Sequence, residues 1–202
     1  ISHGLPFTHA MDIYAGEYED IADASVVIIT AGANQKPGET RLDLVQKNAA
    51  IMRSIIKEIK RVNCEGILLI VSNPVDILTE VALRESGFPK ERVIGSGTVL
   101  DTARLKYIIS EKLDVDSRNV HAFIVGEHGD SELAAWSCAN IYGIKLQDFA
   151  KMRGYEHFAQ DMEEVYKGVR DSAYEIIERK GATYYGIGMA AEKIVEAIVR
   201  NS

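Results

Sequence analysis

Short runs of apolar, mostly β-branched residues alternate along the chain with longer segments whose apolar positions recur at helical spacing. The runs that indicate buried strands are SVVIITA (25–31), GILLIVS (66–72), RVIGSG (92–97) and HAFIVG (121–126). The helical spacing predicts helices over 40–61, 75–85, 100–113, 156–180 and 187–200. Apolar strands separated by helices are typical of a parallel sheet covered on both faces, so the fold class is predicted to be α/β.

A polar cluster follows each of the four predicted strands. Ligands in open parallel sheets bind beyond the carboxyl ends of the strands. If all four strands are parallel, the clusters converge on one edge of the sheet. In chain order the clusters are TAGANQKPGETR (30–41), SNPVD (72–76), GSGTVLDTAR (95–104) and GEHGDSE (126–132).

Composition narrows the function classes. The 202-residue chain carries a formal net charge of -7 and shows no basic stripe, which disfavours nucleic-acid binding. Its longest apolar runs are far shorter than the roughly 18 residues that cross a bilayer, so no membrane role is expected. The two cysteines, Cys64 and Cys138, have neither zinc spacing nor a paired motif, which favours a reducing cytoplasm and indicates no metal site.

The residue types in these clusters indicate proton transfer on a small carboxylate. His128 is the one group there that would exchange a proton near neutral pH. Asp101 can fix the tautomer of His128, and Arg104, three residues further on, shares its helix face. Arg41, after Pro37 and Gly38, can bring a second guanidinium on a mobile loop. Alternatively, His128 is a structural histidine and each arginine a solvated surface cation.

Such a site would hold a carboxylate with an adjacent carbonyl or hydroxyl group, but it contains no electron carrier. A bound nicotinamide would supply that function. No GxSxG sequence signals a serine nucleophile.

Five ordered motifs carry a resemblance to a known family. They are ITAGANQKPGETRLDL (29–44), VSNPVDILT (71–79), VIGSGTVLDTARLKY (93–107), HAFIVGEHGDSELAAWS (121–137) and KGATYYGI (180–187). Over nearly its whole length the chain resembles the bacterial-type L-lactate dehydrogenases. The resemblance implies NAD-dependent interconversion of pyruvate and L-lactate by a homo-oligomer, a tetramer in that family.

The resemblance also implies a role for individual residues. His128 matches the proton donor, Asp101 the aspartate that orients it, Arg104 the carboxylate clamp and Arg41 the mobile-loop arginine. The remaining implied contacts are Asn73 with substrate and nicotinamide, Thr183 with substrate, and Gly32, Ala33, Ser54, Val71 and Ser96 with NAD.

Two positions bear on specificity and regulation. Malate dehydrogenases resemble this family but typically have an arginine where this chain has Gln35, so pyruvate is expected over a dicarboxylate. His121 matches a histidine that binds fructose 1,6-bisphosphate in some bacterial relatives, whereas Lys106 stands in place of the partner arginine. A structural role for His121 at a strand start is the alternative.

The chain departs from the family at its ends. No G-x-G-x-x-G phosphate loop follows a predicted strand, and GIGMAA (186–191) more plausibly begins the last helix. We therefore expect an incomplete Rossmann-like parallel sheet at 1–95, without its first βαβ unit, and part of an α+β substrate-binding domain at 96–202. The alternatives to a lactate dehydrogenase are a malate or other 2-hydroxyacid dehydrogenase and a catalytically silent folded fragment.

Overall fold

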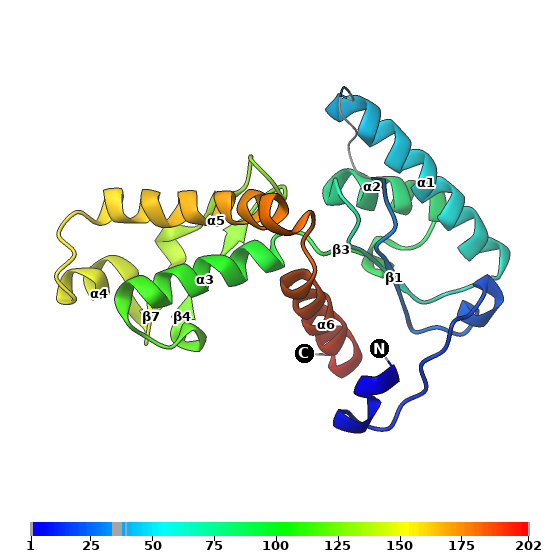
Figure 1. Cartoon of the computed structure of the whole chain (residues 1–202), viewed down its shortest axis with the longest axis horizontal. Coiled ribbons are helices and arrows are strands. Elements are labelled where there is room, and N and C mark those ends of the chain that lie inside the picture. Colours follow the sequence, from blue (N-terminus) through cyan, green and yellow to red (C-terminus); the bar gives the residue numbers. More distant parts are fainter. Residues whose placement is uncertain (1, 34–37, 39, 202) are drawn as a thin grey trace.

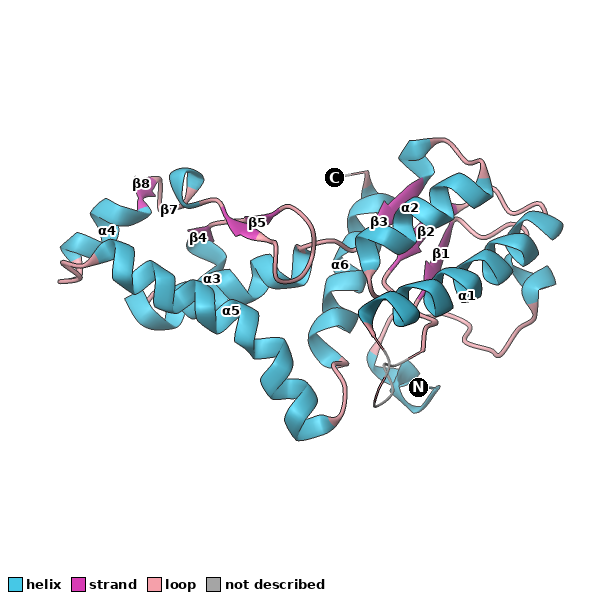
Figure 2. Ribbon diagram, turned by 90° about the horizontal axis from the view of Figure 1, so that it is seen from above, coloured by secondary structure: helices cyan, strands magenta, loops and turns pink. Residues whose placement is uncertain are grey.

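The computed structural model describes residues 2–33, 38 and 40–201, apart from the side chain of Arg41. The described chain forms two lobes with helix α6 (Tyr185–Arg200) between them in both views (Figure 1, Figure 2). One lobe contains a parallel sheet and the other contains helices with short antiparallel strand pairs. The predicted combination of a parallel sheet with an α+β unit is therefore confirmed.

The sheet of the first lobe consists of β1 (Val26–Ile29), β2 (Ile67–Ile70) and β3 (Val93–Gly95), in that spatial order and parallel. Helices α1 (Arg41–Arg61) and α2 (Val75–Ser86) cover one face (Figure 2). The core between helices and sheet includes Ile29, Met52, Ile59, Leu68, Ile70 and Leu78, each at most 4% exposed. These three strands were predicted correctly because their residues are apolar on consecutive positions.

The ends of the two covering helices follow from local chemistry. The Thr40 hydroxyl accepts from the Asp43 N–H, and the Asp43 carboxylate accepts from the Thr40 N–H, which forms a capping box at the start of α1. Helix α2 ends at Gly87, whose φ of 70° is the left-handed conformation that glycine adopts without a steric penalty.

The second lobe is built on α3 (Val99–Leu113) and α5 (Phe158–Lys180), with α4 (Leu146–Met152) at its far end (Figure 1). Its core includes Leu105, Ile109, Ile141, Leu146 and Val165, each at most 2% exposed. The short strands are β4 (Val120–His121), β5 (Ile124–Val125), β6 (Leu133–Ala134), β7 (Asn140–Ile141) and β8 (Ile144–Lys145). Within the described residues, the 3-10 helices are η1 (Ser2–Phe7), η2 (Tyr18–Ile21), η3 (Lys90–Arg92), η4 (Ser117–Asn119) and η5 (Trp136–Cys138).

The prediction of a fourth parallel strand over 121–126 is wrong. The segment divides into β4, which pairs antiparallel with β7, and β5, which pairs antiparallel with β6. Helix α3 supplies partners for the backbone of Ile124, because the Thr102 hydroxyl accepts from its N–H and the Thr98 hydroxyl donates to its carbonyl. Phe123 and Val125, each 47% exposed, alternate with buried Ala122 and Ile124, as in a strand with one covered face.

Helix α6 includes the GIGMAA sequence from its first turn onward, so the expectation that this sequence begins the last helix is confirmed. Ile28, on the sheet face opposite α1 and α2, lines a groove with Ala191 and Val195 of α6. Both cysteines are free, with Cys64 buried and Cys138 exposed. Among the described residues, no helix combines the length and apolar character needed to span a membrane.

The core assignment predicts that substitution of two leucines by alanine changes the free energy of unfolding by very different amounts. Leu78 of α2 is 0% exposed, and Leu42 of α1 is 65% exposed. Leu78→Ala should lower the free energy of unfolding by about 2–5 kcal/mol, because it removes buried apolar atoms and leaves a cavity. Leu42→Ala should change it by about 0.5 kcal/mol or less. Urea denaturation of both variants measures the difference, and equal losses would contradict the core assignment.

Candidate active site

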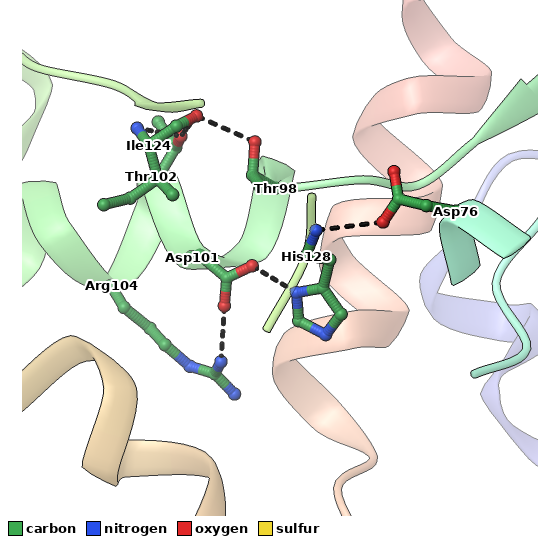
Figure 3. A network of polar contacts seen from close by, with 7 residues as sticks. All are labelled: Asp76, Thr98, Asp101, Thr102, Arg104, Ile124 and His128. Carbon is green, nitrogen blue, oxygen red and sulfur yellow. Dashed lines mark hydrogen bonds and ion pairs between the residues drawn. The ribbon is translucent and has the colours of Figure 1, made fainter. Parts of the chain in front are cut away.

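The first turn of α3 fixes the position of the central carboxylate. Asp101 lies in this turn, where the positive end of the helix dipole favours an anion. The hydroxyls of Thr98 and Thr102 bind the backbone of Ile124 at 2.7 Å and 3.0 Å, which attaches the start of α3 to β5 (Figure 3). Asp101 is 3% exposed as a result and has a fixed orientation toward the loop after β5.

Asp101, Arg104 and His128 form one connected group (Figure 3). The Asp101 Oδ2 lies 2.6 Å from the His128 Nδ1, and its Oδ1 accepts from the Arg104 Nη1 at 2.9 Å. The side chains of Asp101, Arg104 and His128 are 4%, 14% and 27% exposed. The sequence-based expectation that these three residues meet is thus confirmed, although His128 does not come from a parallel strand.

His128 lies in the loop between β5 and β6, and a residue of the other lobe also binds this loop. Gly126 and Gly129 have φ values of 98° and 123°, a backbone conformation that side-chain-bearing residues rarely adopt. The His128 backbone N–H donates to the Asp76 Oδ2 at 2.9 Å, and Asp76 lies in the first turn of α2 (Figure 3). This bond joins the two lobes and brings the loop to the carboxyl end of β2.

The pKa values of the pair are shifted in opposite directions. The hydrogen bond that the His128 ring donates to Asp101 raises the pKa of His128 above its ordinary 6.5, although burial opposes this. Burial alone would raise the pKa of Asp101, but the hydrogen bond and charge of His128, followed by those of Arg104, outweigh burial and lower it. The arrangement therefore favours a histidinium next to a carboxylate.

A second buried carboxyl group lies beside this pair. Glu132 is 3% exposed, and one of its oxygens lies within 4.8 Å of an Asp101 oxygen and a His128 ring nitrogen. Burial first, and then the charge of Asp101, raise the pKa of Glu132 to about 7. Sequence analysis did not assign a role to Glu132, although the residue ends the GEHGDSE cluster.

The carboxyl edge of the parallel sheet is organised by Asn48, which sequence analysis also missed. Asn48 is 3% exposed; its Oδ1 accepts from the Ala33 N–H at 2.8 Å and its Nδ2 donates to the Asn73 carbonyl at 2.9 Å. This side chain therefore links the segments that follow β1 and β2. The sequence did contain a signal for this role, because Asn48 lies inside a predicted amphipathic helix. An asparagine that is buried in the middle of a helix normally has hydrogen-bond partners.

The other candidate residues are less closely connected. Val71 and Ser96 follow β2 and β3, and their N–H groups donate to Ile29 and Ile70 carbonyls at 2.9 Å and 2.8 Å. Ser54 is exposed on α1 and donates its hydroxyl to the Ile51 carbonyl, so no described contact joins it to the sheet edge. Of the remaining candidates, Gly32 follows β1 and the half-buried Thr183 lies between α5 and α6. His121 is exposed on β4, and the Nζ of Lys106 lies 5.9 Å from the Phe123 ring centroid. Gln35 and the Arg41 side chain lie outside the described residues.

Fold and site together define an α/β protein with an imidazole–carboxylate pair and a half-buried guanidinium next to the carboxyl edge of a parallel sheet. Residues 1–95 match the sequence model described as lactate/malate dehydrogenase, NAD binding domain. Residues 98–202 match lactate/malate dehydrogenase, alpha/beta C-terminal domain. The chain belongs to the lactate/malate dehydrogenase family.

Individual relatives agree with this assignment. The chain is 55% identical over 201 residues to the L-lactate dehydrogenase of Acetivibrio thermocellus, and the match covers 100% of the chain and 63% of that protein. It is 57% identical over 199 residues to the L-lactate dehydrogenase of Streptococcus thermophilus (strain CNRZ 1066), covering 98% of the chain and 60% of that protein.

Solved structures of the family are also similar. A lactate dehydrogenase from a deep-sea metagenome library has a TM-score of 0.95 and 53% identity, covering 100% of this chain and 64% of that one. The ligand-bound minor L-lactate dehydrogenase of Enterococcus mundtii has a TM-score of 0.91 and 48% identity, covering 96% and 62%. The chain therefore spans 60–64% of the length of these proteins.

The site geometry predicts that Asp101→Asn lowers the pKa of His128. The substitution removes the carboxylate charge and hydrogen bond that raise this pKa, while burial, which lowers it, remains. At a given pH, a smaller fraction of His128 should then be protonated. NMR titration of the His128 ring measures this, with Asp148→Asn on the exposed side of α4 as control. A His128 pKa equal in both variants would contradict the assigned pairing.

Proposed function

We propose that this chain is the core of an NAD-dependent L-lactate dehydrogenase that interconverts pyruvate and L-lactate. The observation that carries the proposal is the contact of 2.6 Å between the His128 Nδ1 and Asp101, with Arg104 on the other carboxylate oxygen. Membership of the lactate/malate dehydrogenase family and the identity to L-lactate dehydrogenases support it.

His128 would exchange the proton at its Nε2. Its Nδ1 faces Asp101, so the other ring nitrogen is the atom that can meet the keto oxygen of pyruvate (Figure 3). A protonated His128 gives its proton to that oxygen during reduction and takes it back from lactate in the reverse direction. Asp101 keeps the ring in one tautomer and stabilises the cation, and it acts only through His128.

The two arginines would bind different groups of the substrate. A guanidinium has five N–H donors, and the pairing with Asp101 uses the Nη1 of Arg104, which leaves other donors for the substrate carboxylate. Arg41 would stabilise negative charge on the keto oxygen as it develops. Thr183 and Asn73 would complete the pocket, in keeping with their positions after α5 and β2.

The carboxyl edge of the sheet fits a dinucleotide. It is lined by backbone and small residues, Gly32, Ala33 and Ser96 among them, and Asn48 holds two of its segments together. We propose that these residues, with Ser54, Val71 and Asn73, contact NAD. When bound, the reduced cofactor supplies the hydride that converts the keto carbon of pyruvate into that of lactate.

Two further proposals concern assembly and regulation. We infer a cytoplasmic homo-tetramer from the family resemblance. Fructose 1,6-bisphosphate would bind through His121 and Lys106, which lie on the neighbouring elements β4 and α3. The ammonium of Lys106 provides charge for a phosphate but lacks the forked geometry of an arginine.

The proposed proton transfer predicts the behaviour of His128→Ala. Loss of the general acid should lower kcat/KM for pyruvate by about 10²–10⁴-fold. In the unsubstituted chain, reduction should persist above pH 6.5 and decline as the pH rises through the raised pKa of His128, because the protonated form is the donor. The decrease in NADH absorbance with pyruvate measures both effects.

His157→Ala, on an exposed histidine just before α5, is the matched control and should keep the original rate. A wild-type rate in His128→Ala would remove His128 from its role. No turnover by the unsubstituted chain would favour the alternative of a catalytically silent fragment.

Gln35 should decide between lactate and malate chemistry. A dicarboxylate such as oxaloacetate meets no counter-charge at Gln35 and is disfavoured by desolvation. Gln35→Arg should shift the ratio of kcat/KM for oxaloacetate over pyruvate by at least about tenfold, equivalent to about 1.4 kcal/mol. Steady-state kinetics with both keto acids measures the ratio, and an unchanged ratio would remove Gln35 from its role and with it the argument against the malate or 2-hydroxyacid alternative.

A further inference from the structure

Glu132 is a buried acid that the proposed reaction does not use. It is the last residue before β6, and its side chain is enclosed with Asp101 and His128. Its backbone is held at both ends, since its N–H donates to the Gly129 carbonyl at 3.1 Å and its carbonyl accepts from the Tyr166 hydroxyl of α5. The side chain is therefore directed toward the Asp101–His128 pair by a fixed backbone.

The two carboxyl groups share one buried site. An oxygen of Glu132 lies within 4.8 Å of an Asp101 oxygen, and both residues are 3% exposed. Two negative charges so close in a buried site disfavour each other, so one of the two carboxyl groups takes up a proton. Asp101 already faces Arg104 and His128, both of which favour its anion. The proton therefore belongs on Glu132, which has no described cation in contact with its carboxyl group.

We propose that Glu132 is a positioning residue whose protonated carboxyl donates a hydrogen bond to Asp101, holds this carboxylate against His128 and couples its own ionisation to that of the histidine. This inference rests on the proposed function, because it extends the role of the same pair. Asp101 would then bind three partners, Arg104, His128 and Glu132.

The charges that surround Glu132 agree with a neutral acid at the pH where the histidine is charged. Asp101, itself paired with Arg104, faces it from α3, and His128 faces it from its own loop. From α5 it meets the Tyr166 hydroxyl, with Arg170 stacked on that ring at 5.1 Å. Burial and the neighbouring Asp101 raise the pKa of Glu132 to about 7, and its charge, once formed, raises the pKa of His128.

The same three groups have the composition of a divalent-cation site, but Arg104 argues against that reading. The guanidinium already neutralises Asp101 at 2.9 Å, and a hydrogen-bonded proton between the carboxyl groups compensates the second acid. A metal ion would have to displace both.

The test is a pH titration by NMR of the 202-residue chain, following the His128 ring and the carboxyl carbon of Glu132. In the unsubstituted chain, the His128 signals should report two coupled ionisations, one of them the Glu132 step near pH 7. In Glu132→Gln, this step should vanish and the pKa of His128 should fall, because the Glu132 charge that raises it is gone. The matched control is Glu127→Gln, at an exposed acid in the same loop. This substitution should leave the Glu132 step and the pKa of His128 unchanged.

A His128 titration that is unchanged in Glu132→Gln, or shifted equally in Glu127→Gln, would overturn the proposal. If Glu132→Gln does not fold, Asp101→Asn decides. Removing the Asp101 charge should lower the pKa of Glu132 from about 7, and an unchanged value would overturn the proposal.

This measurement is separate from pyruvate turnover. Coupled titration in a chain that does not reduce pyruvate would refute the proposed function and support the positioning role of Glu132. Pyruvate turnover without coupled titration of His128 and Glu132 would refute the positioning role alone.

Discussion

The ion pairs of one buried carboxylate organise this site. Asp101 is almost inaccessible to water, and a buried anion without partners would cost several kcal/mol. Its two oxygens instead meet Arg104 from the same helix and His128 from a loop 27 residues further along the chain. The first of these contacts is local and forms with the helix, since the two residues are three apart. The second requires the tertiary fold, so the carboxylate links helix formation to the placement of the imidazole.

The imidazole is placed by contacts from three helices. Asp76 of α2 binds the His128 backbone, Asp101 of α3 binds its ring, and Tyr174 of α5 donates to Asp130 at 3.0 Å. A loop with two glycines at positive φ would otherwise have considerable conformational freedom. Because α2 belongs to the sheet lobe and α3 and α5 to the other, the histidine lies where the two lobes meet. Its orientation therefore depends on how the lobes are held together.

Most secondary structure was predictable because its signals are local. The capping box at Thr40 and the uninterrupted apolar runs of β1 and β2 are examples. The division of 121–126 into β4, which pairs with β7, and β5, which pairs with β6, was not predictable. In β5 the hydroxyls of Thr98 and Thr102, which are distant in sequence, bind the backbone of Ile124. Asp101, Arg104 and His128 were found from chemistry and from the family resemblance. Asn48 and Glu132 were missed, since their importance arises from burial and from partners distant in sequence.

A charge count connects the buried acids to the substrate proposed for the site. Among Arg104, Asp101, His128 and Glu132, the charges of the first two cancel, so a protonated His128 beside a neutral Glu132 leaves one net positive charge for the single carboxylate of a monoanion. The charge of Arg41 would be directed to the keto oxygen. An ionised Glu132 would cancel that charge and weaken binding of the same anion, whereas a dicarboxylate would leave an uncompensated charge in a desolvated pocket. The proton proposed on Glu132 and the lack of charge on a glutamine side chain at position 35 would thus favour the same class of substrate. Substrate binding and His128 protonation would then reinforce each other, because each supplies the counter-charge that the other lacks.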